Sequence, residues 1–365
     1  MNYLKALCLT SLRATFLLAI SCMSAGATSI NLGGSNLDSI VVERENLFPE
    51  GIEYSSQVES FFLSSITEGT VYQVNSEGIS PFIEDERLVS SVGLQVDEQR
   101  NRLLVANSDS GFSVNSTEAT QQNLAALGIY DLLTGESIAY ANLGTLLPNA
   151  PHIANDIAVD ALGNAYVTDS FSPVIYKVDP QANSSVFLKD ERFEGEGFNL
   201  NGLVYHPNEF LIVTKSNEGL LFKVPLDNPE DFTQIQIDRT LLGSDGLFLV
   251  DNDSLIVVSN ELNRVLAIDT NDNWESAMVV DSFATPDVFP TTATVRESEI
   301  FTLYSNLGIL FDPNNTASVE EYTIQQVGSV TRDAASVSEP VSIWGLLVLV
   351  IGLGWKYQCQ YNVRE

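Results

Sequence analysis

Four oxygen-bearing side chains stand at one repeated position of the sequence. Each lies two residues before the apolar residue that begins a short hydrophobic segment, and a glycine separates the two in three of the four cases. The four residues are Glu50, Asn155, Asn201 and Asp245. Two carboxylates and two amide carbonyls form the kind of oxygen ligand set that hard divalent cations prefer. We therefore expect one divalent cation, Ca²⁺ as the first choice, with Mg²⁺, Mn²⁺ or Zn²⁺ as alternatives.

An ordinary structural explanation exists for each of these residues taken alone, because Asn and Asp are common turn residues before strands. Because all four residues occupy the same position in their segments, a cation site is favoured over four unrelated turn residues. Asp156 is either a fifth ligand, a residue that contacts the ligands, or a plain turn residue. Thr291 occupies the same register in the last segment, and His152 precedes Asn155 by three residues. We expect these three to contact substrate or ligands, with a plain loop position as the alternative for His152.

The segments that must position these side chains form a repeat. Their equivalent apolar residues are spaced by 42, 63, 46, 44 and 46 residues, and they are Ile52, Leu94, Ile157, Leu203, Leu247 and Ala293. Each unit contains several short apolar runs separated by polar turns, and the second run ends in Ser or Asn. A period in the forties built from four short strands is the signature of a β-propeller blade.

We therefore predict an all-β, six-bladed β-propeller over residues 48–328, with residues 40–42 as an outer strand that closes the ring. The spacing of 63 indicates an insertion at residues 107–123 of the second blade, rich in Ser, Thr, Asn and Gln. Since the innermost strands of a propeller surround one central channel, the shared register predicts that the four side chains meet at one height in that channel.

The net charge of −31 excludes a nucleic-acid binder, which needs an excess of clustered cations. Only 18% of the residues are charged and 44% are hydrophobic, which indicates a folded domain with an acidic surface.

The N-terminal segment has the features of a secretory signal peptide. Lys5 and Arg13 precede an apolar stretch, and small residues end it at Ala27. A lipoprotein signal at Cys22 is the alternative. We expect residues 1–27 to be removed and residues 28–47 to lead into the propeller. The protein is thus predicted to be exported to the periplasm, the cell surface or the extracellular space.

The C-terminal segment has an apolar run at residues 341–355, which would form a helix of about 22 Å, short for a bilayer core of about 30 Å. Together with Glu339-Pro340 before it and Lys356 after it, this run resembles a PEP-CTERM sorting tag. The resemblance implies that residues 329–340 are a linker and that residues 341–365 are held in the inner membrane and processed by an exosortase. A plain hydrophobic membrane anchor, permanent where the tag would be transient, is the alternative.

All three cysteines, Cys8, Cys22 and Cys359, lie in these terminal segments. The propeller region therefore has no disulfide, no thiol chemistry and no cysteine ligand for zinc.

The motifs around the four oxygen ligands resemble those of the senescence marker protein/gluconolactonase (regucalcin) family. The similarity runs from Phe48 to about Leu310, and its carriers are FPEGIEY, HIANDIAVD, NLNGLVY and GSDGLFLVD. In such proteins the equivalents of Glu50, Asn201 and Asp245 hold one cation in the channel, and the equivalent of Asn155 completes the site or contacts substrate. The resemblance implies a hydrolase of lactones or esters, with Asp245 as cation ligand and general base.

A Ser-His-Asp hydrolase and a non-catalytic binding propeller are the alternatives to a metal-dependent hydrolase. A Ser-His-Asp mechanism is disfavoured because the chain has only His152 and His206, and the latter is expected to be exposed in a turn of the fourth blade. A non-catalytic propeller that binds a partner at the cell surface or in the extracellular matrix, with a structural cation, remains the alternative to the enzyme.

Overall fold

The computed structural model describes residues 28–315 and 317–332. The expected signal peptide and sorting tag lie outside the described residues. Among the described residues, no helix has the length and apolar character needed to cross a membrane.

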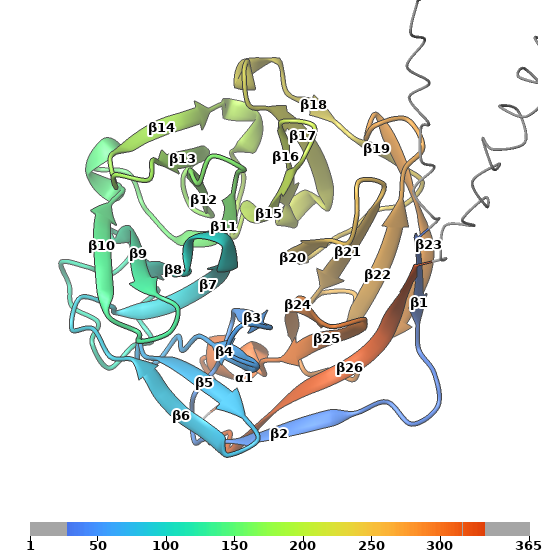
Figure 1. The fold of residues 1–365 in the computed structure, drawn as a ribbon. Coiled ribbons are helices and arrows are strands. Elements are labelled where there is room, and N and C mark those ends of the chain that lie inside the picture. Colours follow the sequence, from blue (N-terminus) through green and yellow to red (C-terminus); the bar gives the residue numbers. More distant parts are fainter. Residues whose placement is uncertain (1–27, 316, 333–365) are drawn as a thin grey trace, which may run out of the picture. The chain divides into compact units, whose positions relative to one another are not determined.

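Six sheets, antiparallel except for one short parallel pairing in blade 5, form a closed ring around one channel, which confirms the predicted six-bladed propeller (Figure 1). Blade 1 consists of β3 (Ile52–Ser55), β4 (Ser60–Leu63), β5 (Val71–Asn75) and β6 (Gly78–Ile83). Blade 2 consists of β7 (Ser90–Asp97), β8 (Arg102–Ser108), β9 (Ala125–Asp131) and β10 (Ser137–Asn142). Blade 3 consists of β11 (Ala154–Val159), β12 (Ala165–Asp169), β13 (Val174–Val178) and β14 (Ser184–Lys189).

The remaining blades follow the same order from the channel outward. Blade 4 consists of β15 (Leu200–His206), β16 (Phe210–Lys215), β17 (Leu220–Pro225) and β18 (Thr233–Gln234). Blade 5 consists of β20 (Ser244–Leu249), β21 (Ser254–Ser259), β22 (Arg264–Asp269), β23 (Ser276–Ala284) and the short parallel β19 (Gln236–Ile237). Blade 6 consists of β24 (Pro290–Arg296), β25 (Glu299–Tyr304), β26 (Glu321–Arg332), β1 (Thr28–Leu32) and β2 (Ser39–Glu43).

The N-terminal strands close the ring by pairing with the last strand of the described chain. Ile40 pairs with Ile324 and Val42 with Tyr322, so β2 is the closing strand expected from the sequence. β1 pairs with the same β26. β26 is long enough to pair with both β1 and β2, and it extends to Arg332. Blade 6 therefore includes the first residues of the range 329–340 that is expected from the sequence to form a linker.

Helices are few and short in the described chain. The helix α1 (Leu307–Phe311) connects β25 to β26. The single-turn 3₁₀ helices are η1 (Glu98–Arg100), η2 (Gly144–Leu146), η3 (Glu191–Phe193), η4 (Ser216–Glu218) and η5 (Pro229–Asp231).

Apolar residues of neighbouring blades pack against each other. Tyr166 and Ile175 of blade 3 share one core cluster with Leu211 of blade 4, and Ile212 of blade 4 shares the next cluster with Val257 of blade 5. Blades 3, 4 and 5 therefore bury apolar faces against their neighbours, as expected for a repeat architecture.

The glycines that follow three of the four candidate ligands are required by the crowding of the innermost strands. A Cβ atom on Gly51 would lie 2.5 Å from the carbonyl oxygen of Val92 in the next blade, and one on Gly202 would lie closer still to the Asp245 carbonyl. Glycine lets neighbouring strands approach near the channel axis.

The insertion of blade 2 folds around a buried carboxylate. Asp109 accepts hydrogen bonds of 2.7 Å from the Gly111 amide and from the hydroxyls of Ser116 and Thr120. This polar centre explains why the segment is rich in Ser and Thr, and it holds the insertion over one mouth of the channel, where Ser108 and Ser110 line the wall.

Candidate functional site

A cavity of about 350 Å³ opens at one end of the channel, and all four predicted ligands line it. Glu50 stands just before β3, Asn155 lies on β11, Asn201 on β15 and Asp245 on β20. These are the innermost strands of blades 1, 3, 4 and 5. Val92 of blade 2 shares the register and lines the same cavity. Residues up to 195 positions apart in the chain thus converge, as the shared register predicts.

The polar floor of this cavity is deeply buried. Asn155 and Asp245 are each 4% exposed and Asn201 is 5% exposed. Glu50 keeps some surface toward the channel, and together with Asn201 it also lines a second cavity further along the axis. Glu50 and Asn201 therefore form the partition between the two halves of the channel.

The residue that directly follows the second strand of a blade positions the candidate ligand at the first strand. The Ser64 hydroxyl accepts hydrogen bonds from the backbone amides of Glu50 (3.1 Å) and Gly51 (2.7 Å). The Asn260 amide donates to the Asp245 carboxylate at 2.9 Å. The Ser and Asn residues that end the second apolar run of each repeat were visible in the sequence, but their role as positioning residues was not predicted.

Asn155 has one acceptor atom without a partner. Its Nδ2 donates to the Ser170 hydroxyl at 2.9 Å, and Ser170 in turn donates to the Leu200 carbonyl at 2.6 Å, which fixes the orientation of the amide. The opposite atom, Asn155 Oδ1, is buried and accepts no hydrogen bond within the described residues. A buried carbonyl oxygen is costly to leave unpaired, and a cation would satisfy it.

The two carboxylates carry strongly perturbed pKa values. Burial, followed by the negative charges of Asp245 and Asp156, raises the pKa of Glu50 well above its usual range. Burial raises the pKa of Asp245 to about 7, with a further upward contribution from Asp156, while hydrogen bonds from Asn260 and Asn201 oppose the shift. No Lys, Arg or His is among the described residues that line either cavity.

These observations fit a bound cation. Carboxylates in a low-dielectric site without a counter-charge are destabilised when ionised. A divalent cation would neutralise the charges of Glu50 and Asp245, and it would be coordinated by the unpaired Asn155 Oδ1. Across residues 28–315 and 317–332, no group of three or more His, Cys, Asp or Glu side chains is arranged as metal ligands. The candidate set is instead two carboxylates and two amides, with room in the cavity for water to complete the coordination.

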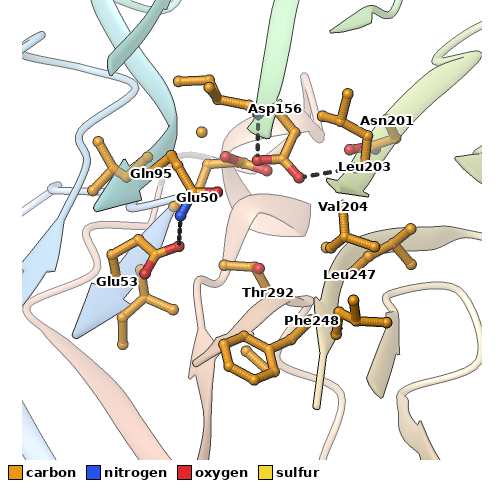
Figure 2. Close-up of a pocket in the computed structure, with 18 of the residues that line it drawn as sticks. Glu50, Glu53, Gln95, Asp156, Asn201, Leu203, Val204, Leu247, Phe248 and Thr292 are labelled. Atoms are coloured by element: carbon orange, nitrogen blue, oxygen red, sulfur yellow. Dashed lines mark hydrogen bonds between the residues drawn. The ribbon is translucent and has the colours of Figure 1, made fainter. Parts of the chain in front are cut away.

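The second cavity, of about 200 Å³, lies in the other half of the channel (Figure 2). Asp156 points into this half, where its carboxylate accepts hydrogen bonds from the Ile157 amide (2.9 Å) and the Leu203 amide (3.3 Å). Asp156 therefore contributes negative charge to the site, as the pKa of Glu50 shows, but it does not line the cavity of the four ligands.

Glu53 faces the same second cavity and was missed in the sequence. Burial, followed by the charges of Asp156 and Glu98, raises its pKa well above the usual range. The signal in the sequence was an acidic residue inside an innermost strand, where most residues are apolar.

Thr291 and His152 do not line either cavity. The Thr291 hydroxyl donates to the Glu50 carbonyl at 2.7 Å and so supports the backbone of that ligand. His152 is buried beside the site, with Nδ1 2.7 Å from Asp169 Oδ2 and Nε2 3.1 Å from the Leu147 carbonyl. Both ring nitrogens are engaged in the protein interior, so the structure gives this imidazole no contact with a ligand in the cavity.

His206 is buried, contrary to the expectation of an exposed turn residue. Its ring stacks on Phe210 at 4.1 Å between centroids and its Nε2 lies 2.8 Å from the Asn252 carbonyl of blade 5. Burial, against the weaker effect of the Asn252 hydrogen bond, lowers its pKa. The turn packs against the next blade, a contact that does not follow from the local sequence.

Comparisons with known proteins find the fold but no close relative. No family model and no curated protein matches the chain. Among solved structures, the allergen Mala s 1 of Malassezia sympodialis has a TM-score of 0.64 at 16% identity, over 83% of this chain and 99% of that one. A gluconolactonase from Xanthomonas campestris has a TM-score of 0.54 at 13% identity, over 83% and 96% of the two chains. A luciferin-regenerating enzyme has a TM-score of 0.55 at 14% identity, over 82% and 98%. The structural neighbours thus include gluconolactonase-like propellers, and at these identities the likeness shows the shared propeller fold.

Proposed function

We propose that this protein is an exported, metal-dependent hydrolase that opens a lactone or cleaves an ester in the cavity of about 350 Å³. The observation that carries the proposal is the convergence of Glu50, Asn155, Asn201 and Asp245 on one cavity, which no basic side chain of residues 28–315 and 317–332 lines. The presence of a gluconolactonase among proteins of the same fold supports this reaction class.

In the proposed mechanism, Glu50, Asn201, Asp245 and Asn155 hold the divalent cation. The cation, when bound, supplies polarisation of the substrate carbonyl and a lowered pKa of bound water. Asp245 accepts a proton from the attacking water as the new carbon–oxygen bond forms. It returns this proton to the alkoxide oxygen when the ester bond breaks, so that the products are a carboxylic acid and an alcohol. The Asn260 hydrogen bond keeps the Asp245 carboxylate in the orientation needed for both transfers.

The test uses the full chain, a panel of small lactones and aryl esters, and calorimetric titration with Ca²⁺. We expect turnover that disappears in chelator and falls by at least about a hundredfold in Asp245→Asn, since a combined ligand and base is lost. Asp253→Asn, which alters an exposed carboxylate of the same blade, is the matched control. Circular dichroism checks that each variant is folded.

Two results would change the conclusion. Cation binding without turnover on any substrate would favour the non-catalytic binding propeller with a structural cation. Absence of cation binding by the wild type would overturn the site itself. Export through the N-terminal segment and sorting through the C-terminal segment stay predictions, which mass spectrometry of the mature termini would check.

A further inference from the structure

Five phenylalanines form a connected group beside the candidate catalytic cavity, and three of them line it. They come from five different connecting segments and are Phe112, Phe171, Phe198, Phe289 and Phe311, called here the aromatic rim. The ring of Phe311 lies 5.5 Å from Phe112, 6.2 Å from Phe198 and 5.9 Å from Phe289 between centroids. Phe171 lies 5.2 Å from Phe198. One connected aromatic group therefore covers loops of blades 2, 3 and 4 and the connections that flank β24 and β25.

The rim exposes apolar surface beside the cavity. Phe112 is 41% exposed and Phe198 38% exposed. Aromatic side chains that are exposed together at a cavity are a feature of binding surfaces. Phe198, Phe289 and Phe311 also line the cavity itself, where they continue into the aliphatic wall formed by Ile66, Val92, Ile153 and Leu307.

Phe289 is held in an unfavourable backbone conformation beside the cavity. Its φ of 51° lies in the left-handed region, which is costly for a bulky residue. The Ser305 hydroxyl donates to its carbonyl at 2.6 Å and the Asn306 amide donates to the neighbouring Val288 carbonyl at 2.8 Å. The segment before α1 thus keeps this ring in place, as is common for strained residues at ligand sites.

Several polar groups of the wall are already engaged within the protein, although Ser110, Ser216, Glu196 and Glu261 also line it. The Ser90 hydroxyl already donates to the Ile66 carbonyl at 2.6 Å, and the Ser108 hydroxyl to the Ala154 carbonyl at 2.7 Å. Asn217 uses its amide protons on Glu196 and Asn199, which leaves only its Oδ1 as a free acceptor among the described atoms. Ser90 and Ser108 therefore do not replace the hydrogen bonds to water that a polyhydroxylated substrate would lose beside them.

The charge of the lining disfavours anions. Every ionisable residue that lines the cavity is acidic, and these are Glu50, Glu196, Asp245 and Glu261. A substrate with a carboxylate or phosphate would have to pass the acidic side chains Glu196 and Glu261 without meeting a basic side chain.

We infer that the substrate is an uncharged lactone or ester with an apolar alkyl or aryl group, whose carbonyl reaches the polar floor while the apolar group packs against Phe198, Phe289 and Phe311. This inference rests on the proposed function for the reaction and adds the substrate class. The cavity of about 350 Å³ falls in the range of about 300–1,000 Å³ that is usual for small-molecule sites, enough for a lactone ring with a short chain.

The test compares γ-lactones with side chains of zero to six carbons, glucono-δ-lactone, and a γ-lactone that ends in a carboxylate. We expect kcat/KM to rise about threefold to fourfold for each methylene buried, and the sugar lactone and the carboxylated lactone to be at least about tenfold poorer than the neutral six-carbon lactone. In Phe198→Ala the six-carbon lactone should lose about tenfold more kcat/KM than the unsubstituted one, and Phe198→Leu should restore most of that difference. Phe187→Ala is the matched control, because Phe187 lies on the outer strand β14 of blade 3, where its ring packs on Tyr166 and does not line the cavity.

Binding of the corresponding γ-lactams, which resist hydrolysis, separates the two proposals. If lactam affinity rises with chain length and falls in Phe198→Ala while no lactone is turned over, the proposed reaction fails and the apolar ligand class stands. If lactam affinity and kcat/KM do not depend on chain length, or if the sugar lactone is the best substrate, the inference is overturned while hydrolysis stands.

Discussion

The side-chain amide of Asn260 donates a hydrogen bond of 2.9 Å to Oδ2 of Asp245. The two residues lie at the same end of β20 and β21, which pair so that Ser244 faces Ser259. The candidate ligand and the residue that orients it are thus neighbours in one blade, although fifteen positions separate them in the chain. This hydrogen bond stabilises the ionised form of Asp245 and lowers its pKa against the effect of burial.

Asn260→Ala should therefore weaken both cation binding and turnover. Loss of a residue that orients a metal ligand typically costs about 10-fold to 100-fold in affinity or activity. Without the hydrogen bond the pKa of Asp245 rises further, so the acid limb of the pH–rate profile moves to higher pH. Cation titration and kcat/KM against pH measure both effects. Asn208→Ala, an exposed change on blade 4, is the control, and an unshifted acid limb in Asn260→Ala would contradict the assigned role.

Stability without the cation should fall as the pH is raised from about 4 to about 7. Burial raises the pKa of Asp156 and of Asp245 to about 7 in the folded protein, whereas an unfolded Asp titrates near about 3.9. Between these values the folded state binds more protons than the unfolded state, so the free energy of unfolding decreases with rising pH. A saturating cation should remove this decrease because it compensates the ionised carboxylates.

Urea unfolding at several pH values, with chelator or with Ca²⁺, measures this dependence. Asp245→Asn should flatten the curve in chelator, and the exposed Asp253→Asn should leave it unchanged. Equal slopes in Asp245→Asn and wild type would show that general surface repulsion, and not the channel carboxylates, causes the fall.

Removing Arg102 should destabilise the junction between blades 2 and 3. Its guanidinium lies 2.6 Å from the Asp97 carboxylate, both side chains are buried, and it also donates to the Gly163 carbonyl of blade 3 at 3.1 Å. Arg102→Ala leaves the buried Asp97 carboxylate with Arg100 as its remaining ion-pair partner, at 3.3 Å. The loss should therefore be below the value of about 3–5 kcal/mol for a fully unpaired buried charge but above about 1 kcal/mol. Arg239→Ala breaks an exposed pair with Asp238 and should cost less than about 1 kcal/mol. Chemical denaturation measures both, and similar small losses would argue against a structural role for the buried pair.

His152→Gln should affect stability and not catalysis. Burial lowers the pKa of His152, but the hydrogen bond and charge of Asp169 outweigh it, so the net shift is upward. The stabilisation from the protonated ring is present below the unfolded pKa of about 6.5 and is lost as the pH rises through the folded value. We expect a loss of about 1–3 kcal/mol at pH 6 that is smaller at pH 9. A large drop in kcat with unchanged stability would contradict this prediction and indicate that His152 takes part in catalysis.

The number of blades and the height of the four ligands follow from the sequence itself. Repeat spacing and strand alternation are local properties, so a shared offset from Ile52, Ile157, Leu203 and Leu247 is enough to place Glu50, Asn155, Asn201 and Asp245 around one axis. The closing strand was also visible, because residues 40–42 form an apolar β-branched run outside the repeats.

Contacts between blades were decided only by the tertiary structure. Successive residues of a strand face opposite sides, and the channel has two halves, so Asp156 lines a different cavity from Asn155 and meets Glu53 of blade 1 there. The burial of His206 depends on blade 5, and the aromatic rim gathers loops that share no sequence pattern. These residues come into contact only when the ring of blades closes. Which loops are then neighbours depends on the closed ring, so it cannot be predicted from the local sequence.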